Sequence, residues 1–186
     1  MPQANTDPRI LRTRQLIMDS FVDLSAKKEF KDITIKDITT AAQINRSTFY
    51  YHFEDIFDLL DKALTEVLLV NLSYQDYENE QLNEENLVRI FEAITNFQDS
   101  LSNRCHRGYE DTIARIIRDQ LKVILTNMLK NQYPEGDSLG LERTATIFSY
   151  GLYGIATEWR NSLEKMEPKD FIKPAIPYLL AGIHNK

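Results

Sequence analysis

Proline and glycine are almost missing from the long central part of the chain. Of the 186 residues, six are proline and six are glycine, and between Arg9 and Tyr133 there is no proline and a single glycine, Gly108. These two residues usually mark hairpins and the loops of α/β units. Their scarcity argues against a sheet-rich fold and predicts that most of this stretch is helical.

Cysteine and long apolar runs are equally scarce. The single cysteine, Cys105, excludes an internal disulfide, and the adjacent Cys105–His106 pair is too small to be a metal-ligand set. The longest apolar run, residues 67–70, is far shorter than the ~18 residues that cross a bilayer. Residues 1–10 lack the basic and apolar regions of a secretion signal. We therefore expect a soluble, cytoplasmic protein with no metal, no cofactor and no membrane partner.

Enzyme signatures are missing as well, whereas the charge distribution is informative. The sequence contains no glycine-rich phosphate loop and no nucleophile elbow, so we do not expect an enzyme. The net charge is −6, but residues 1–53 hold 8 basic and 6 acidic groups (+2), and residues 54–186 hold 14 and 22 (−8). Binding of nucleic acid depends on the charge of the contacting face and not on the net charge of the protein. The surplus of basic residues lies in the first third of the chain.

Apolar residues recur at spacings of three and four along nearly the whole chain, which is the pattern of amphipathic helices. Thr34, Asn45 and Asp55 each precede such a segment and are suitable N-caps. The polar segment 73–85 is the best candidate for a boundary between halves. The predicted class is all-α, and the expected helical segments are 9–25, 35–42, 46–53, 55–72, 87–97, 109–131, 141–163 and a final one opened by Pro168.

The two short helices expected at 35–42 and 46–52 have the tight spacing of a helix-turn-helix motif, whose second helix enters the major groove of DNA. The apolar residues of this region predict a small core, and helical spacing leaves the polar ones on the other face. The core set is Ile17, Phe21, Leu24, Ile35, Ile38, Ala42, Ile44, Phe49 and Phe53. The same spacing also occurs in helical bundles that never meet DNA.

The run TIKDITTAAQINRSTFYYHF at residues 34–53 resembles the N-terminal domain of the TetR family of transcriptional regulators. The resemblance extends over about residues 9–64, and the Ala41–Ala42 pair and the Thr48–Phe53 run are its most specific parts. It implies a DNA-binding helix-turn-helix domain over residues 1–54. A helical dimerisation and ligand-binding domain would follow over residues 55–186, with the helix from about 55 to 72 linking the two.

Polar residues of this motif are the candidate DNA contacts. Arg46 could reach a guanine edge or a phosphate, and short side chains after it let the helix approach the backbone. Tyrosine and histidine at the helix end can donate to phosphates, and the start of the preceding helix could hold a neighbouring phosphate. The complete set is Thr34, Lys36, Arg46, Ser47, Thr48, Tyr50, Tyr51 and His52.

Two positions depart from the family pattern. The family usually has glycine in the turn, where this chain has Gln43, so we expect a backbone cost or an altered turn. The family commonly has lysine in the first turn of the fourth helix, where this chain has Ile56 between acidic residues. Both departures favour an alternative function, in which a TetR-like interaction protein acts through a protein or ligand partner while DNA binding is weak or lost.

The segment 148–159 resembles the C-terminal domain of one TetR subgroup, in which a glycine-containing helix runs to a tryptophan. Glycine inside a helix costs about 1 kcal/mol, so a close approach of another backbone is expected. Pro174 and Pro177 are unfavourable inside a continuous last helix, although Pro174 could start a separate turn. The expected dimer contacts are Gly151, Gly154, Ile155, Phe171 and Leu179, and the candidate effector lining is Phe91, Phe97, Ile113, Ile117, Phe148, Tyr153 and Trp159.

These observations predict a sequence-specific DNA-binding regulator. By the resemblance it is a homodimeric repressor that binds a pseudo-palindromic operator and is released by a small-molecule effector. Its expected partners are double-stranded DNA, a second copy of itself and that effector. An apolar stripe at helical spacing is core unless convergent polar groups accompany it, so the effector site depends on polar groups that spacing alone does not locate.

Overall fold

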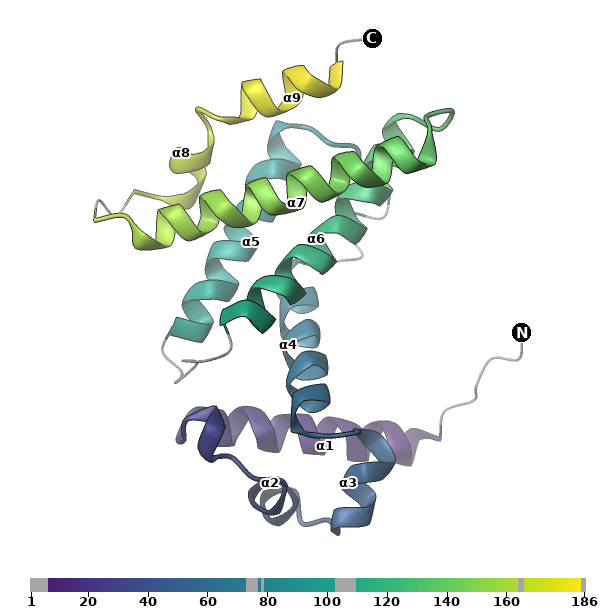
Figure 1. Ribbon diagram of the computed structural model, residues 1–186, viewed down its shortest axis with the longest axis vertical. Helices are drawn as coiled ribbons and strands as arrows, with labels where there is room; N and C mark the ends of the chain where they lie inside the picture. Colours follow the sequence, from purple (N-terminus) through teal and green to yellow (C-terminus); the bar gives the residue numbers. More distant parts are fainter. Residues whose placement is uncertain (1–6, 73–76, 78, 103–109, 164–165, 185–186) are drawn as a thin grey trace. The chain divides into compact units, whose positions relative to one another are not determined.

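The computed structural model describes residues 7–72, 77, 79–102, 110–163 and 166–184 (Figure 1). All the regular elements in these ranges are helices, which confirms the predicted all-α class. The chain forms two compact units, residues 1–64 with 101–109 and residues 65–100 with 110–186. Among the helices of the described ranges, none is long and apolar enough to span a membrane.

The first unit contains three α-helices and the beginning of a fourth, with a short 3-10 helix between the first two (Figure 1). Helix α1 packs against α2, and α2 packs against α3. These helices begin and end within one or two residues of the predicted positions. Their bounds are α1 (Pro8–Ser25), η1 (Phe30–Asp32), α2 (Ile35–Ala41), α3 (Arg46–His52) and α4 (Ile56–Leu72).

The core of the first unit is close to the predicted one. Six of the predicted residues are buried, namely Ile17, Phe21, Ile38, Ala42, Phe49 and Phe53. Leu24, Ile35 and Ile44 are half-buried instead. Phe30 of η1, which is not in the predicted core set, is also buried and meets the ring of Phe21 edge-on at 5.7 Å.

Helix α4 begins where the sequence predicts, because Asp55 caps it. The Asp55 carboxylate accepts hydrogen bonds from the backbone N–H groups of Phe57 and Asp58, both at 2.8 Å. The Asp58 carboxylate in turn accepts from the backbone N–H of Glu54 at 3.1 Å and from Lys62 Nζ at 2.7 Å. Burial acts to raise the pKa of Asp58, but these bonds outweigh it and hold that pKa below its usual value.

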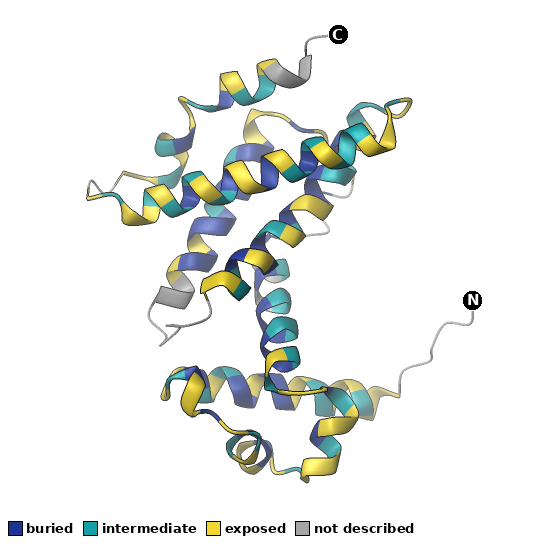
Figure 2. Cartoon of the chain, in the orientation of Figure 1, coloured by how far each residue is buried: buried dark blue, intermediate teal, exposed yellow. Residues whose placement is uncertain are grey.

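The second unit is built on long helices. Helix α6 packs along α7, and the short α8 packs against α7. Figure 2 shows buried and exposed segments alternating along these helices, as amphipathic helices require. Their bounds are α5 (Glu84–Ser102), α6 (Glu110–Gln132), α7 (Ser138–Asn161), α8 (Pro168–Ile172) and α9 (Ile176–His184).

Three elements of this unit differ from the sequence expectation. Helix α5 extends beyond the expected segment 87–97 at both ends. Helix α7 begins three residues early, because Asp137 caps it by accepting from the backbone N–H of Gly140 at 2.7 Å. The final segment is two short helices, α8 and α9, and Pro174 lies in the break between them. Part of the expected boundary segment, 73–76 and 78, and the Cys105–His106 pair lie outside the described residues.

Candidate DNA-binding site

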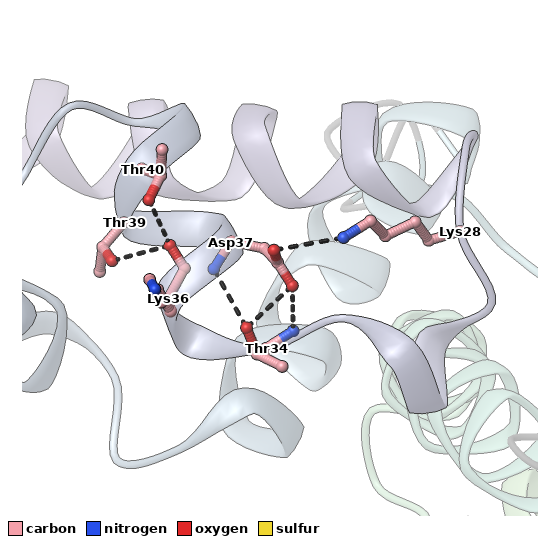
Figure 3. A network of polar contacts seen from close by, with 6 residues as sticks. All are labelled: Lys28, Thr34, Lys36, Asp37, Thr39 and Thr40. Carbon is pink, nitrogen blue, oxygen red and sulfur yellow. Dashed lines mark hydrogen bonds and ion pairs between the residues drawn. The ribbon is translucent and has the colours of Figure 1, made fainter.

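The start of α2 is fixed by a network of polar contacts (Figure 3). Thr34 is its N-cap, and its hydroxyl oxygen accepts from the backbone N–H of Asp37 at 3.1 Å. The Asp37 carboxylate accepts from the backbone N–H of Thr34 at 2.9 Å and from its hydroxyl at 2.8 Å. This reciprocal capping box satisfies two backbone donors that the first turn would otherwise leave unpaired.

Lys28 extends this network to the loop after α1. Its Nζ lies 3.2 Å from Asp37 Oδ1 (Figure 3). The backbone and hydroxyl hydrogen bonds from Thr34, followed by the contact with Lys28, lower the pKa of Asp37 to about 2. The Thr34 hydroxyl is therefore occupied within the fold, whereas Lys36, two residues later, is exposed.

The turn between α2 and α3 has the backbone geometry of a glycine turn without the glycine. Gln43 has φ of 53°, in the left-handed region. The backbone N–H of Gln43 donates to the carbonyl of Thr40 at 3.3 Å, and that of Ile44 donates to the carbonyl of Thr39 at 3.0 Å. These two bonds form a Schellman motif, with Gln43 at its left-handed position. The turn thus keeps the usual geometry, and Gln43 carries the backbone cost that the sequence predicted.

Helix α3 presents a polar face to solvent. Its N-cap is Asn45, as predicted, although the Asn45 side chain makes no capping hydrogen bond. Phe49 is fully buried and anchors the opposite face. The polar residues around it are exposed or half-buried: Arg46, Ser47, Tyr50 and Tyr51 are exposed, and Thr48 and His52 are half-buried. The structure therefore brings the predicted contacts of α3 onto the surface of one short helix.

Arg46 lies against its own helix. Its Nη2 donates to Tyr50 Oη at 3.1 Å, and its guanidinium carbon lies 5.6 Å from the centre of the Tyr50 ring. The Tyr50 hydroxyl keeps its own proton to donate elsewhere. Tyr51 is 69% exposed, and its ring meets that of His52 edge-on at 5.1 Å.

Basic groups surround the end of α3. The guanidinium of Arg14 on α1 lies 5.2 Å from the centre of the Phe53 ring, and Lys62 Nζ on α4 lies 5.5 Å from it. Partial burial, and then the positive charge of Arg14, lower the pKa of His52 below its usual 6.5. His52 is therefore neutral at pH 7.

The other predicted residues lie in the second unit. Of the expected effector lining, Phe91, Phe97, Ile117 and Phe148 are buried, and Ile113, Tyr153 and Trp159 are half-buried. The Trp159 indole N–H donates to the carbonyl of Met166 at 2.8 Å. Of the expected dimer contacts, Gly151 and Gly154 are exposed, and Ile155, Phe171 and Leu179 are half-buried.

Sequence reasoning missed several polar residues of both units. Asp37 had a signal, since Thr34-x-x-Asp37 is the spacing of a capping box. Lys28 and Arg14 had none, because their contacts depend on how the helices pack. Gln98 of α5 is 2% exposed and its Oε1 has no hydrogen-bond partner in the described structure. Its spacing from Phe91 and Ile94 places Gln98 on the apolar face of α5, a signal that the sequence reasoning did not use.

Comparison with known proteins finds helix-turn-helix regulators that are similar to the chain in sequence, although no family model matches it. It is 39% identical over 59 residues to the uncharacterized HTH-type transcriptional regulator YxbF of Bacillus subtilis, a match over 31% of this chain and 16% of that protein. It is 28% identical over 122 residues to DhaS of Lactococcus lactis, an HTH-type dhaKLM operon transcriptional activator, over 59% of this chain and 63% of DhaS. The chain thus matches less than two thirds of the length of either relative.

Solved structures resemble the chain over nearly its whole length. The dihydroxyacetone kinase operon activator DhaS has a TM-score of 0.62 at 17% identity, covering 93% of this chain and 97% of DhaS. A TetR transcriptional regulator from Streptococcus agalactiae scores 0.61 at 22% identity, with coverage of 93% and 96%. The TetR family repressor AlkX from Dietzia scores 0.56 at 16% identity, with coverage of 96% and 98%. With the geometry of α2 and α3, these comparisons confirm the resemblance and identify the chain as a helix-turn-helix protein with the TetR-family fold.

Proposed function

We propose that the protein is a homodimeric transcriptional regulator that binds a pseudo-palindromic operator through α3. The observation that carries this proposal is the Schellman turn at Gln43, which joins two short helices and leaves the polar side of α3 in solvent. A recognition helix needs this combination, because its base-reading face must stay exposed while its other face anchors it to the unit.

The residues of the motif divide into two roles in this proposal. Arg46 reads a base edge, since its guanidinium can donate twice to guanine. Ser47 and Thr48 are short enough to let the start of α3 approach the DNA backbone, and Tyr50, Tyr51 and His52 donate to phosphates. Lys36 contacts a neighbouring phosphate, whereas Thr34 supports it mainly by capping α2.

Dimerisation supplies the second recognition helix. In the second unit, Ile147 is 72% exposed and Tyr150 is 59% exposed on α7, and both lie beside the open positions of Gly151 and Gly154. Exposed apolar side chains next to unfilled space favour a protein partner. The recognition helices of the DNA-bound dimer would then stand about 34–36 Å apart, one turn of DNA.

Repression, with release by a small molecule, is the finer part of the proposal. Support for an effector site comes from Gln98, because an unpaired buried acceptor costs about 1–3 kcal/mol. It lies four residues from Ile94 and seven from Phe91, on the same face of α5. We expect an effector with an apolar body and a hydroxyl or amide donor for Gln98 Oε1. Gln98→Leu should abolish its effect on DNA binding while leaving DNA affinity unchanged.

Activation is a second candidate, favoured by the similarity to DhaS, which is named as an operon activator. A reporter gene placed behind the selected operator separates the two modes. Expression that falls when the protein is produced supports repression, and expression that rises supports activation.

The test of DNA binding is selection of bound duplexes from a random library, followed by a salt titration of the enriched sequence. We expect an inverted repeat, with log K falling by about 0.9 per neutralised phosphate for each unit of log salt. Arg46→Ala should weaken binding by about 1–3 kcal/mol and relax specificity at one position of each half-site. Lys122→Ala, an exposed lysine of α6 in the other unit, is the matched control.

If an intact dimer enriches no duplex, the result contradicts the proposal and favours the interaction-protein alternative. If a duplex is enriched but the double variant Arg46→Ala, Tyr51→Phe binds it as tightly as the parent, the proposed function stands. The assignment of the contact residues is then refuted.

A further inference from the structure

One face of α7 is exposed along most of the helix (Figure 2). The residues of this face follow each other at spacings of three and four, which places them on one side of a helix. They are Leu139, Arg143, Ile147, Gly151, Gly154 and Glu158, with Tyr150 beside them. The centre of the face is apolar or empty, and a charge of opposite sign stands on either side of it.

The two glycines leave space that the described chain does not fill. A Cβ atom added at Gly151 or Gly154 would meet nothing within 4 Å. Each glycine nevertheless destabilises the helix by about 1 kcal/mol relative to alanine. Within the described residues no packing gain offsets this cost, so contact with a neighbouring molecule is the physical reason for glycine at these positions.

Tyr150 is held in place at the edge of this face. The guanidinium carbon of Arg118 on α6 lies 4.7 Å from the centre of the Tyr150 ring and 5.3 Å from that of Tyr153. A cation stacked on the ring restricts a side chain that is otherwise 59% exposed. Tyrosine and arginine are both enriched among the residues that dominate binding near the centre of protein interfaces.

The geometry points to an antiparallel contact between α7 and α7 of a second copy, centred between Tyr150 and Gly151. This inference rests on the homodimer proposed above and adds its register. Two-fold symmetry places residues at equal distances on either side of the centre opposite each other. Ile147 then faces Gly154 of the second copy, so that a large side chain meets an open position, twice in each dimer.

The same register pairs the charges of the face. Arg143 stands opposite Glu158 of the second copy, and neither residue has an ion pair or hydrogen bond within the part of the chain that is described. A register centred between Leu152 and Tyr153 would instead set Ile147 against the Glu158 carboxylate and leave Arg143 opposite a serine. Charge complementarity therefore selects the first register over its neighbour.

Charge reversal tests the register in the full-length chain. Arg143→Glu and Glu158→Arg each turn two attractive pairs into two repulsive ones, so each variant should dimerise about tenfold or more weakly by sedimentation velocity. Mixing the two variants restores both pairs, and a heterodimer should form with close to the parent affinity. Lys122→Glu on α6 is the control for a charge reversal away from the face and should leave dimerisation unchanged.

Disulfide trapping gives an independent reading, in a Cys105→Ser background. Ile147→Cys with Gly154→Cys should cross-link into a covalent dimer under mild oxidation, because facing positions fall within disulfide range. Ile147→Cys with Glu158→Cys should not, since these positions face each other only in the other register. The reverse pattern, or reversal variants that dimerise like the parent without mixing, would overturn the register. A parent chain that sediments as a monomer would overturn the homodimer itself.

Discussion

Replacing Gln43 by glycine should stabilise the protein, although glycine usually destabilises. The reason is the φ of 53° at Gln43, a conformation that a residue with a Cβ atom adopts at a cost. The side chain of Gln43 is exposed and is not needed for packing. The substitution therefore changes the backbone preference of the turn and little else.

The expected size follows from two opposing contributions. A non-glycine residue in the left-handed region costs about 1–2 kcal/mol, which glycine avoids. Glycine is also more disordered in the unfolded chain, which costs about 0.5–1 kcal/mol. The net gain for Gln43→Gly is then about 0.5–1 kcal/mol in the free energy of unfolding. Gln43→Ala keeps the Cβ atom and should be nearly neutral, and Gln43→Val should be destabilising because β-branched residues fit this region poorly.

Chemical denaturation followed by circular dichroism measures these changes. Ala41→Gly is the control for glycine itself, because Ala41 is the last residue of α2, is exposed and has no positive φ. It should lose about 0.5–1 kcal/mol. The reasoning would be refuted if both glycine variants lost the same stability, since the left-handed turn would then carry no cost at Gln43.

Three further changes test the first unit. Phe49→Ala should cost about 3–5 kcal/mol, because Phe49 is fully buried, and a lower denaturant midpoint would show it; a loss below 1 kcal/mol would contradict its place in the core. Because the pKa of Asp37 is about 2 when folded and 3.8 in its usual state, its stabilisation is complete above pH 3.8 and is lost as pH falls toward 2. The Asp37→Asn variant should not show this loss of stability between pH 3.8 and 2, and thermal unfolding measured over that pH range checks it. His52 has a lowered pKa, so folding stability should fall as pH drops below 6.5, and an imidazole NMR titration with a midpoint above 6.5 would rule this out.

Local signals explain which parts of the first unit were predictable. Thr34, Asn45 and Asp55 mark helix starts through their own side chains or backbone, so α2, α3 and α4 begin where the sequence indicates. For the turn at Gln43, the family resemblance implied either a backbone cost or an altered geometry, and the φ of 53° corresponds to the first. The exposed polar side of α3 followed from helical spacing around Phe49.

Packing between separate elements explains part of what the sequence did not reveal. Phe30 lies in a polar stretch without periodicity, and only packing against Phe21 makes it a core residue. Lys28 reaches Asp37 across a loop. Ile147 lies in the largely apolar middle of α7, yet it is 72% exposed. The contacts of Phe30 and Lys28 join separate elements, which helical spacing does not predict.

Because Arg46 contacts Tyr50, the side chain of this proposed base-reading arginine is already restricted when the protein folds, before DNA binds. A free arginine side chain carries about 2 kcal/mol of rotamer entropy, and a partner at 3.1 Å on the same helix already restricts it before DNA arrives. Part of the ordering cost is thus met during folding, so less of it opposes binding. Removing the Tyr50 hydroxyl would therefore weaken operator binding partly through entropy, with a loss that a calorimeter would find in TΔS.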